Sequence, residues 1–492
     1  MTTQIKLAKL AILLILTAAI ITACGENLEE NLPSNLVTLS ILTPSVYTPL
    51  IRAVESDMQE YFAETGIDFY IEITDYNLLD GMELMQQNAT LQTMLMAGDG
   101  YDIVFLNWLP PNIRSFADNG FLLNVYDLID QDPNLTRDDF FTSVLSALEY
   151  RGGLYNFPLT FGFDFIGINA NLPDSVLNDF SEKSQLSMLE IMQILAALQA
   201  EYPEIYANFP YNSNFSLLYF PTSMLSRIVH DFFDFDNAES HFDSAKFVDF
   251  ITVMQGTIPI HAENFNPANI IANFTMINEM TQMAEQNIFL HTPRIGRNFS
   301  PLIPLFGTVD NQFFRFLPIA DTHGNLLLDT TPTISDTWAD VIFPAVGDGV
   351  VAWGFTQRLL HRMLLVAPND FSLNFGTGLG TAELAIPILR SELEPHFNRV
   401  MNHFSHFEGR FSFTPLNGIQ PGINDTAEIA AASAAALARL TELANSPVSV
   451  IDANAAALFE DDLIDSFMLG SISAETLAQE FQNRASLWLM GG

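Results

Sequence analysis

The chain has a single cysteine, Cys24, among its 492 residues, so it cannot form an internal disulfide bond. Basic side chains are also scarce: 19 lysines and arginines stand against 58 aspartates and glutamates, which leaves a net charge of −39. A nucleic-acid-binding protein needs a basic surface, so this composition excludes nucleic acid as a partner of the chain as a whole. The acidity favours solubility through self-repulsion, with capture of cations or avoidance of an anionic wall as the functional alternative.

Catalytic and nucleotide-binding motifs are absent as well. The sequence contains no GxSxG, no HExxH and no P-loop, and the glycines of residues 376–380 do not form GxGxxG. Pairs of carboxylates occur throughout so acidic a chain, so none of them singles out a glycosidase. These absences predict a protein that is not an enzyme and binds no cofactor.

Two short segments offer candidate metal ligands, but neither predicts a metal site. His396, His403 and His406 are close in sequence, yet they have no cysteine and few carboxylates beside them. The acidic run at residues 231–237 lacks the glycine and the terminal glutamate of a calcium-binding loop, so we interpret it as a solvated turn. We therefore expect no bound metal.

The apolar stretch at residues 10–23 is too short for a comfortable transmembrane helix, which needs about 20 residues. It follows Lys6 and Lys9, and this arrangement fits a secretory signal peptide. The stretch ends in Ile-Thr-Ala-Cys24, which resembles a bacterial lipobox and implies lipidation of Cys24, palmitate included, as a membrane anchor. An uncleaved anchor with an incidental cysteine is the alternative. Residues 25–35 are polar and predict a flexible tether.

The rest of the chain has a globular composition, 49% hydrophobic, and a length that suggests two to four domains or lobes. Strand patterns at residues 37–42, 69–73 and 103–106 alternate with helical patterns at 50–62 and 78–96. Strand, helix, strand, helix, strand is typical of a doubly wound α/β lobe.

The strand at residues 103–106 ends in Asn107 and Trp108, and Pro110 and Pro111 then forbid further strand pairing. Ligands of open α/β sheets bind in the crevice beyond the carboxyl ends of the strands. Asn107 and Trp108 are therefore candidates for a polar contact and a stacking ring, and Tyr47 follows the first strand in the same way. Turn capping for Asn107 and core packing for the rings are the alternatives.

A second stretch, residues 154–169, predicts one or two strands with a bend at Gly162. Phe161 and Asp164 flank the point where the chain is expected to cross between lobes. Phe161 also fits a core position, whereas a buried Asp164 would need partners such as ligand hydroxyls. Trp338 has a loop-like setting and is a further ligand candidate, whereas Trp353 and Trp488 lie in helical patterns and predict packing.

Together these segments resemble the extracellular solute-binding proteins of bacterial ABC importers, in particular the sugar-type lipoproteins of family 1. The resemblance spans nearly the whole mature chain and rests on five segments in the expected order, which are the lipobox at Cys24, residues 101–129, residues 152–172, residues 232–251 and residues 459–489. Residues 290–420 match this family poorly.

The resemblance implies an α/β, two-lobed periplasmic-binding-protein-like fold of type II. Each lobe would be a doubly wound sheet flanked by helices, with extra helices at the C-terminus. The expected N-terminal lobe comprises residues 36–162 plus about 300–350. The expected C-terminal lobe comprises residues 163–299 plus about 351–492.

The resemblance also implies a monomer, lipid-anchored at the extracellular face of the cytoplasmic membrane, that captures a carbohydrate and delivers it to the permease and ATPase of an ABC importer. Sugars present apolar faces and rims of hydroxyls, so stacking rings and polar side chains suit them. The candidate ligand contacts are Tyr47, Asn107, Trp108, Phe161, Asp164 and Trp338. A peptide or polyol as solute, or a surface glycoside hydrolase or adhesin, remains open at this point.

Overall fold

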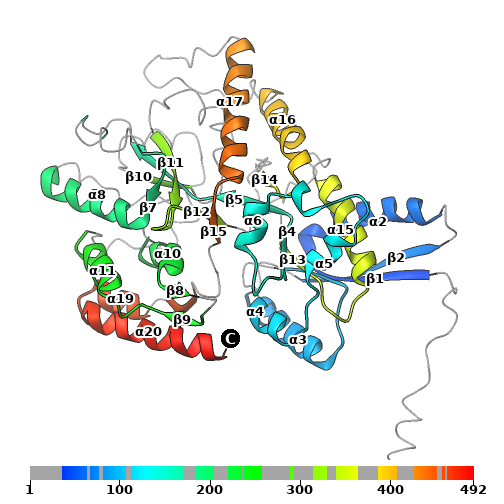
Figure 1. Cartoon of the computed structure of the whole chain (residues 1–492), viewed down its shortest axis with the longest axis horizontal. Helices are drawn as coiled ribbons and strands as arrows, with labels where there is room; N and C mark the ends of the chain where they lie inside the picture. Colours follow the sequence, from blue (N-terminus) through cyan, green and yellow to red (C-terminus); the bar gives the residue numbers. More distant parts are fainter. Residues whose placement is uncertain are drawn as a thin grey trace, which may run out of the picture.

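The structure is a computed structural model, drawn as a cartoon in Figure 1. The residues it describes are 36–63, 67–76, 81–106, 112–169, 174, 177, 183–203, 220–234, 237–257, 289–292, 314–329, 340–363, 386–406, 426–450, 457–459 and 462–491. Two halves lie side by side in Figure 1, with strands passing between them. Cys24 and residues 25–35 lie outside the described residues.

The first half contains a five-stranded sheet of order β2-β1-β3-β13-β4. Its strands are β1 (Leu36–Pro44), β2 (Asp68–Tyr76), β3 (Ile103–Phe105), β13 (Asp340–Ile342) and β4 (Phe157–Pro158). β1 is parallel to both β2 and β3, whereas β13 is antiparallel to both β3 and β4. The three strands predicted from the alternating pattern are confirmed, and β13 and β4 extend their sheet.

Helices connect these strands and cover the sheet. α2 (Thr48–Ala63) joins β1 to β2, and α3 (Gly81–Ala97) joins β2 to β3, as the sequence predicts. α3 ends at Gly98, whose positive φ of 71° is the left-handed conformation that favours glycine after a helix. The other helices of this half are α4 (Ile113–Asp118), α5 (Val125–Asp130), η2 (Arg137–Asp139), α6 (Thr142–Ala147), α15 (Gly349–Met363), α16 (Arg390–His406) and α17 (Thr426–Ala444).

The first sheet is buried on both faces. Successive residues of β3 alternate between two hydrophobic clusters: Ile103 and Phe105 pack in the larger cluster, and Val104 and Leu106 in the smaller one. The side-chain period of a strand is two, so an unbroken apolar run supplies both faces at once. This burial on both sides explains why the segment has no polar residue between Ile103 and Leu106.

The second half has its own hydrophobic cluster, rich in phenylalanine. Phe242 packs edge-to-face on Phe247 with centroids 5.1 Å apart, and Phe459 packs on Phe481 at 4.9 Å. Its elements are β7 (Leu186–Ser187), α8 (Met188–Glu201), α10 (Phe220–Arg227), η4 (Val229–Asp231), β8 (Phe233–Asp234), β9 (Glu239–Ser240), α11 (Ala245–Thr257), η9 (Ala457–Phe459), α19 (Asp462–Met468) and α20 (Ala474–Gly491).

The last helix, α20, begins with a side-chain cap. The hydroxyl of Ser473 accepts a hydrogen bond from the backbone N–H of Thr476 at 3.3 Å, which satisfies one of the donors left over at a helix start. Within the described ranges, no helix has both the length and the apolar content that a membrane crossing requires.

A second sheet, of order β10-β6-β11-β12-β5-β14, joins the two halves, with β15 paired to β12 and β7 to β11. Its pairings are antiparallel along this order, and only β7 and β15 are parallel to their partners. The bounds are β5 (Thr160–Phe163), β6 (Phe165–Asn169), β10 (Phe289–Thr292), β11 (Phe314–Ala320), β12 (Leu326–Asp329), β14 (Ile386–Pro387) and β15 (Val448–Val450).

The chain passes from β5 to β6 at Asp164, two residues beyond Gly162, where the sequence predicts a bend. Gly162 stays inside β5, where it is paired with Asp329 of β12. The break falls at Asp164 because its backbone N–H donates to Leu327 O at 3.3 Å, whereas its carbonyl accepts from Ile319 N at 2.8 Å. One residue thus changes strand partner, so β5 ends and β6 begins around it.

The two main hydrophobic clusters divide the chain differently from the predicted lobe boundary at about residue 351. Side chains of α15, α16 and α17 pack in the first cluster, among them Ala352, Leu393 and Leu440. The second cluster takes up the chain again only at η9 and the helices after it. The reason lies in β15, which follows α17 and leads the chain back across to the second half.

Asp102 ties β3 to β1 and to the start of α15. Its carboxylate accepts hydrogen bonds from the backbone N–H and the hydroxyl of Ser40, at 2.6 and 2.7 Å, and from the N–H of Asp348 at 2.7 Å. Gly347 approaches so closely that an added Cβ would lie 2.6 Å from the Asp102 Cα. A charged acceptor here satisfies three donors from two separate elements.

We expect Asp102→Ala to lower the free energy of unfolding by about 1–3 kcal/mol, because it leaves these three donors without their acceptor. The exposed Asp99 offers a matched control, since its carboxylate accepts from Gly100 N at 2.9 Å, and Asp99→Ala should change stability by less than about 0.5 kcal/mol. Urea denaturation of both variants measures the difference. Equal losses in the two would refute the role given to Asp102.

Candidate functional site

The carboxyl ends of β1, β2 and β3 lie at one edge of the first sheet. Parallel pairing sets Pro44 of β1 opposite Tyr76 of β2, and Ile41 opposite Ile103 of β3. In Figure 1, β1 begins at the outer side of its half and runs toward the other half. This edge therefore faces the second half, which is where the sequence predicts ligand contacts.

Tyr47 lies at this edge, in the short helix η1 (Ser45–Tyr47) that follows β1. Its side chain is 2% exposed, and its ring packs on Phe105 with centroids 5.5 Å apart. The ring thereby contributes to the first hydrophobic cluster. As a ligand contact, Tyr47 stays a prediction.

Asn107, Trp108 and Trp338 lie outside the described residues, but the strands that lead to them are described. Leu106, just after β3, donates its backbone N–H to the carbonyl of Asp340 at 2.8 Å, and Asp340 begins β13. The chain thus leaves the sheet after Leu106 and enters it again at Asp340, at one hydrogen-bonded pair. Each tryptophan is two residues from that pair in sequence.

Phe161 and Asp164 lie at the crossing between the halves, and both are buried. Phe161 is 1% exposed and packs edge-to-face on Phe141 and Phe163, with centroids 5.5 and 5.8 Å away. Asp164 is 0% exposed, and its carboxylate accepts a hydrogen bond from the guanidinium of Arg227 in α10. As ligand contacts, Phe161 and Asp164 stay predictions.

The ion pair between Asp164 and Arg227 lies at the point where the halves are joined. Arg227 is itself only 8% exposed, and it stands in the last turn of α10. A carboxylate this deeply buried is strongly destabilised unless a cation and hydrogen bonds compensate for its lost hydration. The pair therefore ties α10 of the second half to the crossing strand.

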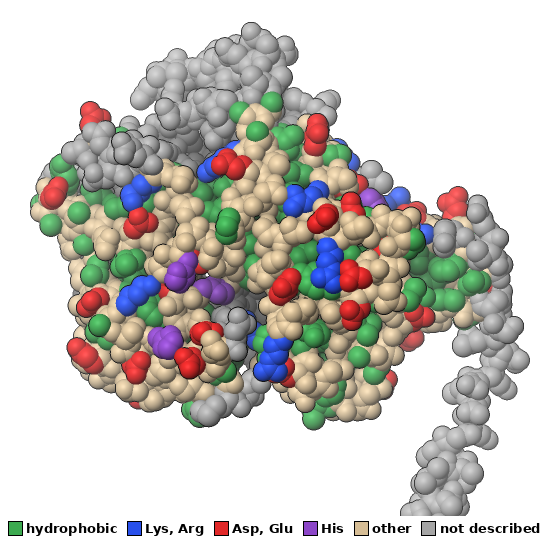
Figure 2. All heavy atoms as spheres, viewed as in Figure 1, with side chains coloured by type: hydrophobic (Ala, Val, Ile, Leu, Met, Phe, Trp, Pro, Cys, Tyr) green, Lys and Arg blue, Asp and Glu red, His purple; other side chains and the backbone are tan. Residues whose placement is uncertain are grey.

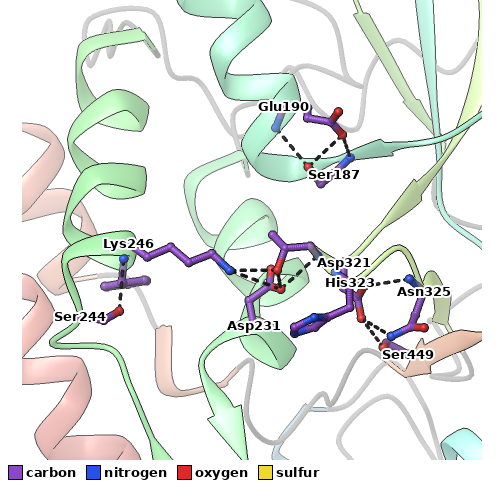
Figure 3. A network of polar contacts seen from close by, with 11 residues as sticks. Ser187, Glu190, Asp231, Ser244, Lys246, Asp321, His323, Asn325 and Ser449 are labelled. Carbon is purple, nitrogen blue, oxygen red and sulfur yellow. Dashed lines mark hydrogen bonds and ion pairs between the residues drawn. The ribbon is translucent and has the colours of Figure 1, made fainter. Parts of the chain in front are cut away.

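A network of polar contacts fixes the turn between β11 and β12 (Figure 3). The Asp321 carboxylate accepts from the backbone N–H groups of His323 and Asn325, at 2.9 and 2.8 Å, and from the hydroxyl of Ser449 at 2.7 Å. Since Ser449 belongs to β15, this carboxylate joins two of the segments that pass between the halves.

The same turn is held to the second half by η4 and α11. Asp231 accepts hydrogen bonds from the backbone N–H and the hydroxyl of Thr322, the former at 3.1 Å. Lys246 donates to the Thr322 hydroxyl at 2.9 Å and lies 4.0 Å from the Asp231 carboxylate. The acidic run at residues 231–237 thus contributes one carboxylate to an internal contact, where the sequence predicted a solvated turn.

On the face shown in Figure 2, the seam between the two halves is hollowed, and acidic side chains are spread over both halves without gathering in one patch. Among the described residues, no group of three or more His, Cys, Asp or Glu side chains could hold a metal ion.

Trp353 packs in the core, as its helical pattern predicts. Its indole N–H donates to the Asp132 carboxylate at 2.8 Å, and its ring meets Phe157 edge-to-face at 5.4 Å. Trp488 also packs on its own half, but its ring lies 5.8 Å from the guanidinium of Arg114 in the first half. No pattern in the sequence indicates this contact, because residues 114 and 488 are far apart along the chain.

No protein-family model matches the chain, and a search of curated proteins finds no match. Solved structures do match. A putative oligosaccharide periplasmic-binding protein from Synechococcus sp. MITs9220 aligns with a TM-score of 0.51 and 12% identity, over 92% of this chain and 99% of that one. The sugar-binding protein MalE from Xanthomonas citri gives a TM-score of 0.51 and 12% identity, over 92% of this chain and 98% of that one.

At this level of identity the likeness shows the fold. The chain is a mixed α/β protein with the two-lobed fold of periplasmic-binding proteins, as the sequence resemblance implies. We refer to the two halves as the first and second lobe from here on. The sheet that passes between the lobes is largely antiparallel, whereas a doubly wound sheet would be parallel.

The buried pair at the crossing yields a stability prediction. We expect Arg227→Met to lower the free energy of unfolding by about 3–5 kcal/mol, because it takes the cation from a carboxylate that stays buried. Arg439→Met removes the cation of an exposed pair with Glu442, and should cost less than about 1 kcal/mol. Thermal and urea denaturation of the two variants provide the comparison. Equal stability of Arg227→Met and the parent would show that Asp164 does not depend on this partner.

Proposed function

We propose that this chain is a lipid-anchored extracellular solute-binding protein of the sugar-type family, which captures a carbohydrate between its lobes and delivers it to an ABC importer. The observation that carries the proposal is the hydrogen bond between Leu106 and Asp340 at the edge facing the second lobe. It supports the proposal because Leu106 and Asp340, each two residues from a candidate tryptophan in sequence, are bonded at the edge where α/β sheets hold their ligands.

An oligosaccharide suits such a site better than a charged solute. Pyranose rings have apolar faces that stack on aromatic side chains, and their hydroxyl rims need amides or carboxylates as partners. Trp108 and Trp338 are the proposed stacking rings, and Asn107 is the proposed hydroxyl partner. Tyr47, buried at the same edge, and Phe161 and Asp164, buried at the crossing, complete the proposed set.

The proposed mechanism is closure of the lobes around the ligand. A ligand that contacts both lobes stabilises the closed arrangement, and only that arrangement docks productively on the importer. The crossing strands restrict the relative motion to bending, because each passes between lobes under hydrogen bonds to its neighbours. The sugar and oligosaccharide neighbours in fold are binding proteins, which supports a role in capture without catalysis.

A lipid on Cys24 would hold the protein, as a monomer, at the extracellular face of the cytoplasmic membrane. Residues 25–35 would then serve as the tether between the anchor and β1, which begins at Leu36 on the outer side of the first lobe. Two or more acyl chains give stable membrane binding, whereas one gives only marginal, reversible binding.

Incubation with a panel of oligosaccharides tests capture. We expect one member to raise the melting temperature without any new reducing ends, since a ligand present at 100 times its Kd stabilises the folded state by about 2.7 kcal/mol. Trp108→Ala should abolish this rise. Trp353→Phe, at a buried ring that is not one of the proposed contacts, should lower the melting temperature of the free protein and preserve the rise. Formation of new reducing ends would identify a hydrolase instead.

Replacement of the lipidation residue tests the anchor. We expect Cys24→Ser to remove the incorporation of labelled palmitate and the diacylglycerol-dependent membrane association, because the thioether can no longer form. Cell fractionation and mass spectrometry of the N-terminal peptide measure both effects. Unchanged lipid attachment in Cys24→Ser would exclude this cysteine as the modified residue.

A further inference from the structure

One contact joins the lobes at a distance from the crossing strands. Arg114 lies on α4 of the first lobe and Trp488 on α20 of the second, and the guanidinium carbon is 5.8 Å from the centroid of the Trp488 ring. In Figure 1 the carboxyl end of α20 reaches the neighbourhood of α4, at the bottom of the seam, whereas β5, β12 and β15 cross near its upper part. A cation this close to an aromatic face is attracted by the ring quadrupole.

Each partner is held in place by its own lobe. Arg114 also lies 5.9 Å from the Tyr150 ring, and the Tyr150 hydroxyl donates to the Asp118 carboxylate at 2.9 Å. On the other side, the Trp488 ring packs edge-to-face on Phe233 with centroids 5.6 Å apart. The guanidinium is thus shared between a ring of its own lobe and a ring of the opposite lobe, and both rings are preorganised.

The opposite end of the seam is fixed more firmly. There the Asp321 turn is bonded to β15 through Ser449 and to η4 through Asp231, so the crossing segments are tied to the second lobe by side-chain as well as backbone hydrogen bonds (Figure 3). An opening of the lobes that keeps these bonds rotates one lobe against the other about this end. Such a rotation separates residues most at the far end of the seam, which is where Arg114 meets Trp488.

We infer that Arg114 and Trp488 form a latch that stabilises the closed arrangement of the lobes before any ligand is present. The inference deepens the proposed function. The apparent dissociation constant of a ligand equals its intrinsic value divided by the closed fraction, so the latch tightens binding without touching the ligand. Loss of the latch leaves the ligand contacts intact and lowers the population that can use them.

The distance between the lobes, measured without ligand, tests the latch. Cys24→Ser leaves the full chain free of native thiols. Gln92→Cys on α3 and Glu480→Cys on α20 then place spin labels at exposed positions on the two lobes. In this background, we expect pulsed electron paramagnetic resonance to show mainly short distances between the two spin labels, which correspond to the closed arrangement. Arg114→Met should shift the ratio of long to short distances by about two- to thirty-fold, the range that cation–π contacts span.

Arg52→Met is the matched control, because Arg52 lies 5.9 Å from the Tyr70 ring within the first lobe and should leave the distance distribution unchanged. Trp488→Phe keeps an aromatic face and should give a smaller shift than Arg114→Met. An Arg114→Met distribution identical to that of the parent, or an equal shift in Arg52→Met, overturns the latch. Since no sugar is present, this result is independent of the oligosaccharide panel. A shift in Arg114→Met together with no binding to any oligosaccharide would support the latch and contradict a carbohydrate as the ligand.

Discussion

Hydrogen bonds between antiparallel strands at the crossing point hold the two lobes together, and the rest of the structure depends on them. Asp164 donates to β12 and accepts from β11, so a single residue is bonded to both strands of the returning hairpin. A crossing made of paired strands resists twisting, since twisting would break several backbone hydrogen bonds at once.

The crossing also determines which edge of the first sheet can carry long loops. Strands β1, β2 and β3 end at the edge that faces the second lobe, and β13 returns to the same edge beside β3. Buried clusters on both faces of this sheet leave its edge as the place where loops can extend without exposing apolar surface. The Asp102 carboxylate fixes the opposite end of β3 to β1 and α15, so the edge has a rigid support.

Much of the fold was predictable from the sequence because its signals are local. The strand pattern at residues 103–106 predicted β3, and the helical pattern at residues 78–96 predicted α3. The bend at Gly162 failed for an equally physical reason: glycine permits a bend, but the partners of Asp164 decided where the strand breaks.

The sequence by itself determined which segments are strands and helices, and which rings and polar residues follow the strand ends, since periodicity and capping act over a few neighbouring residues. Only the tertiary structure decided that Leu106 meets Asp340, that Asp164 is paired with Arg227, and that Arg114 lies over Trp488. These partners are separated by 63 residues in the case of Asp164 and Arg227, and by far more in the other two. No local pattern encodes such contacts, because they form only when packing of both lobes brings distant segments to the same seam.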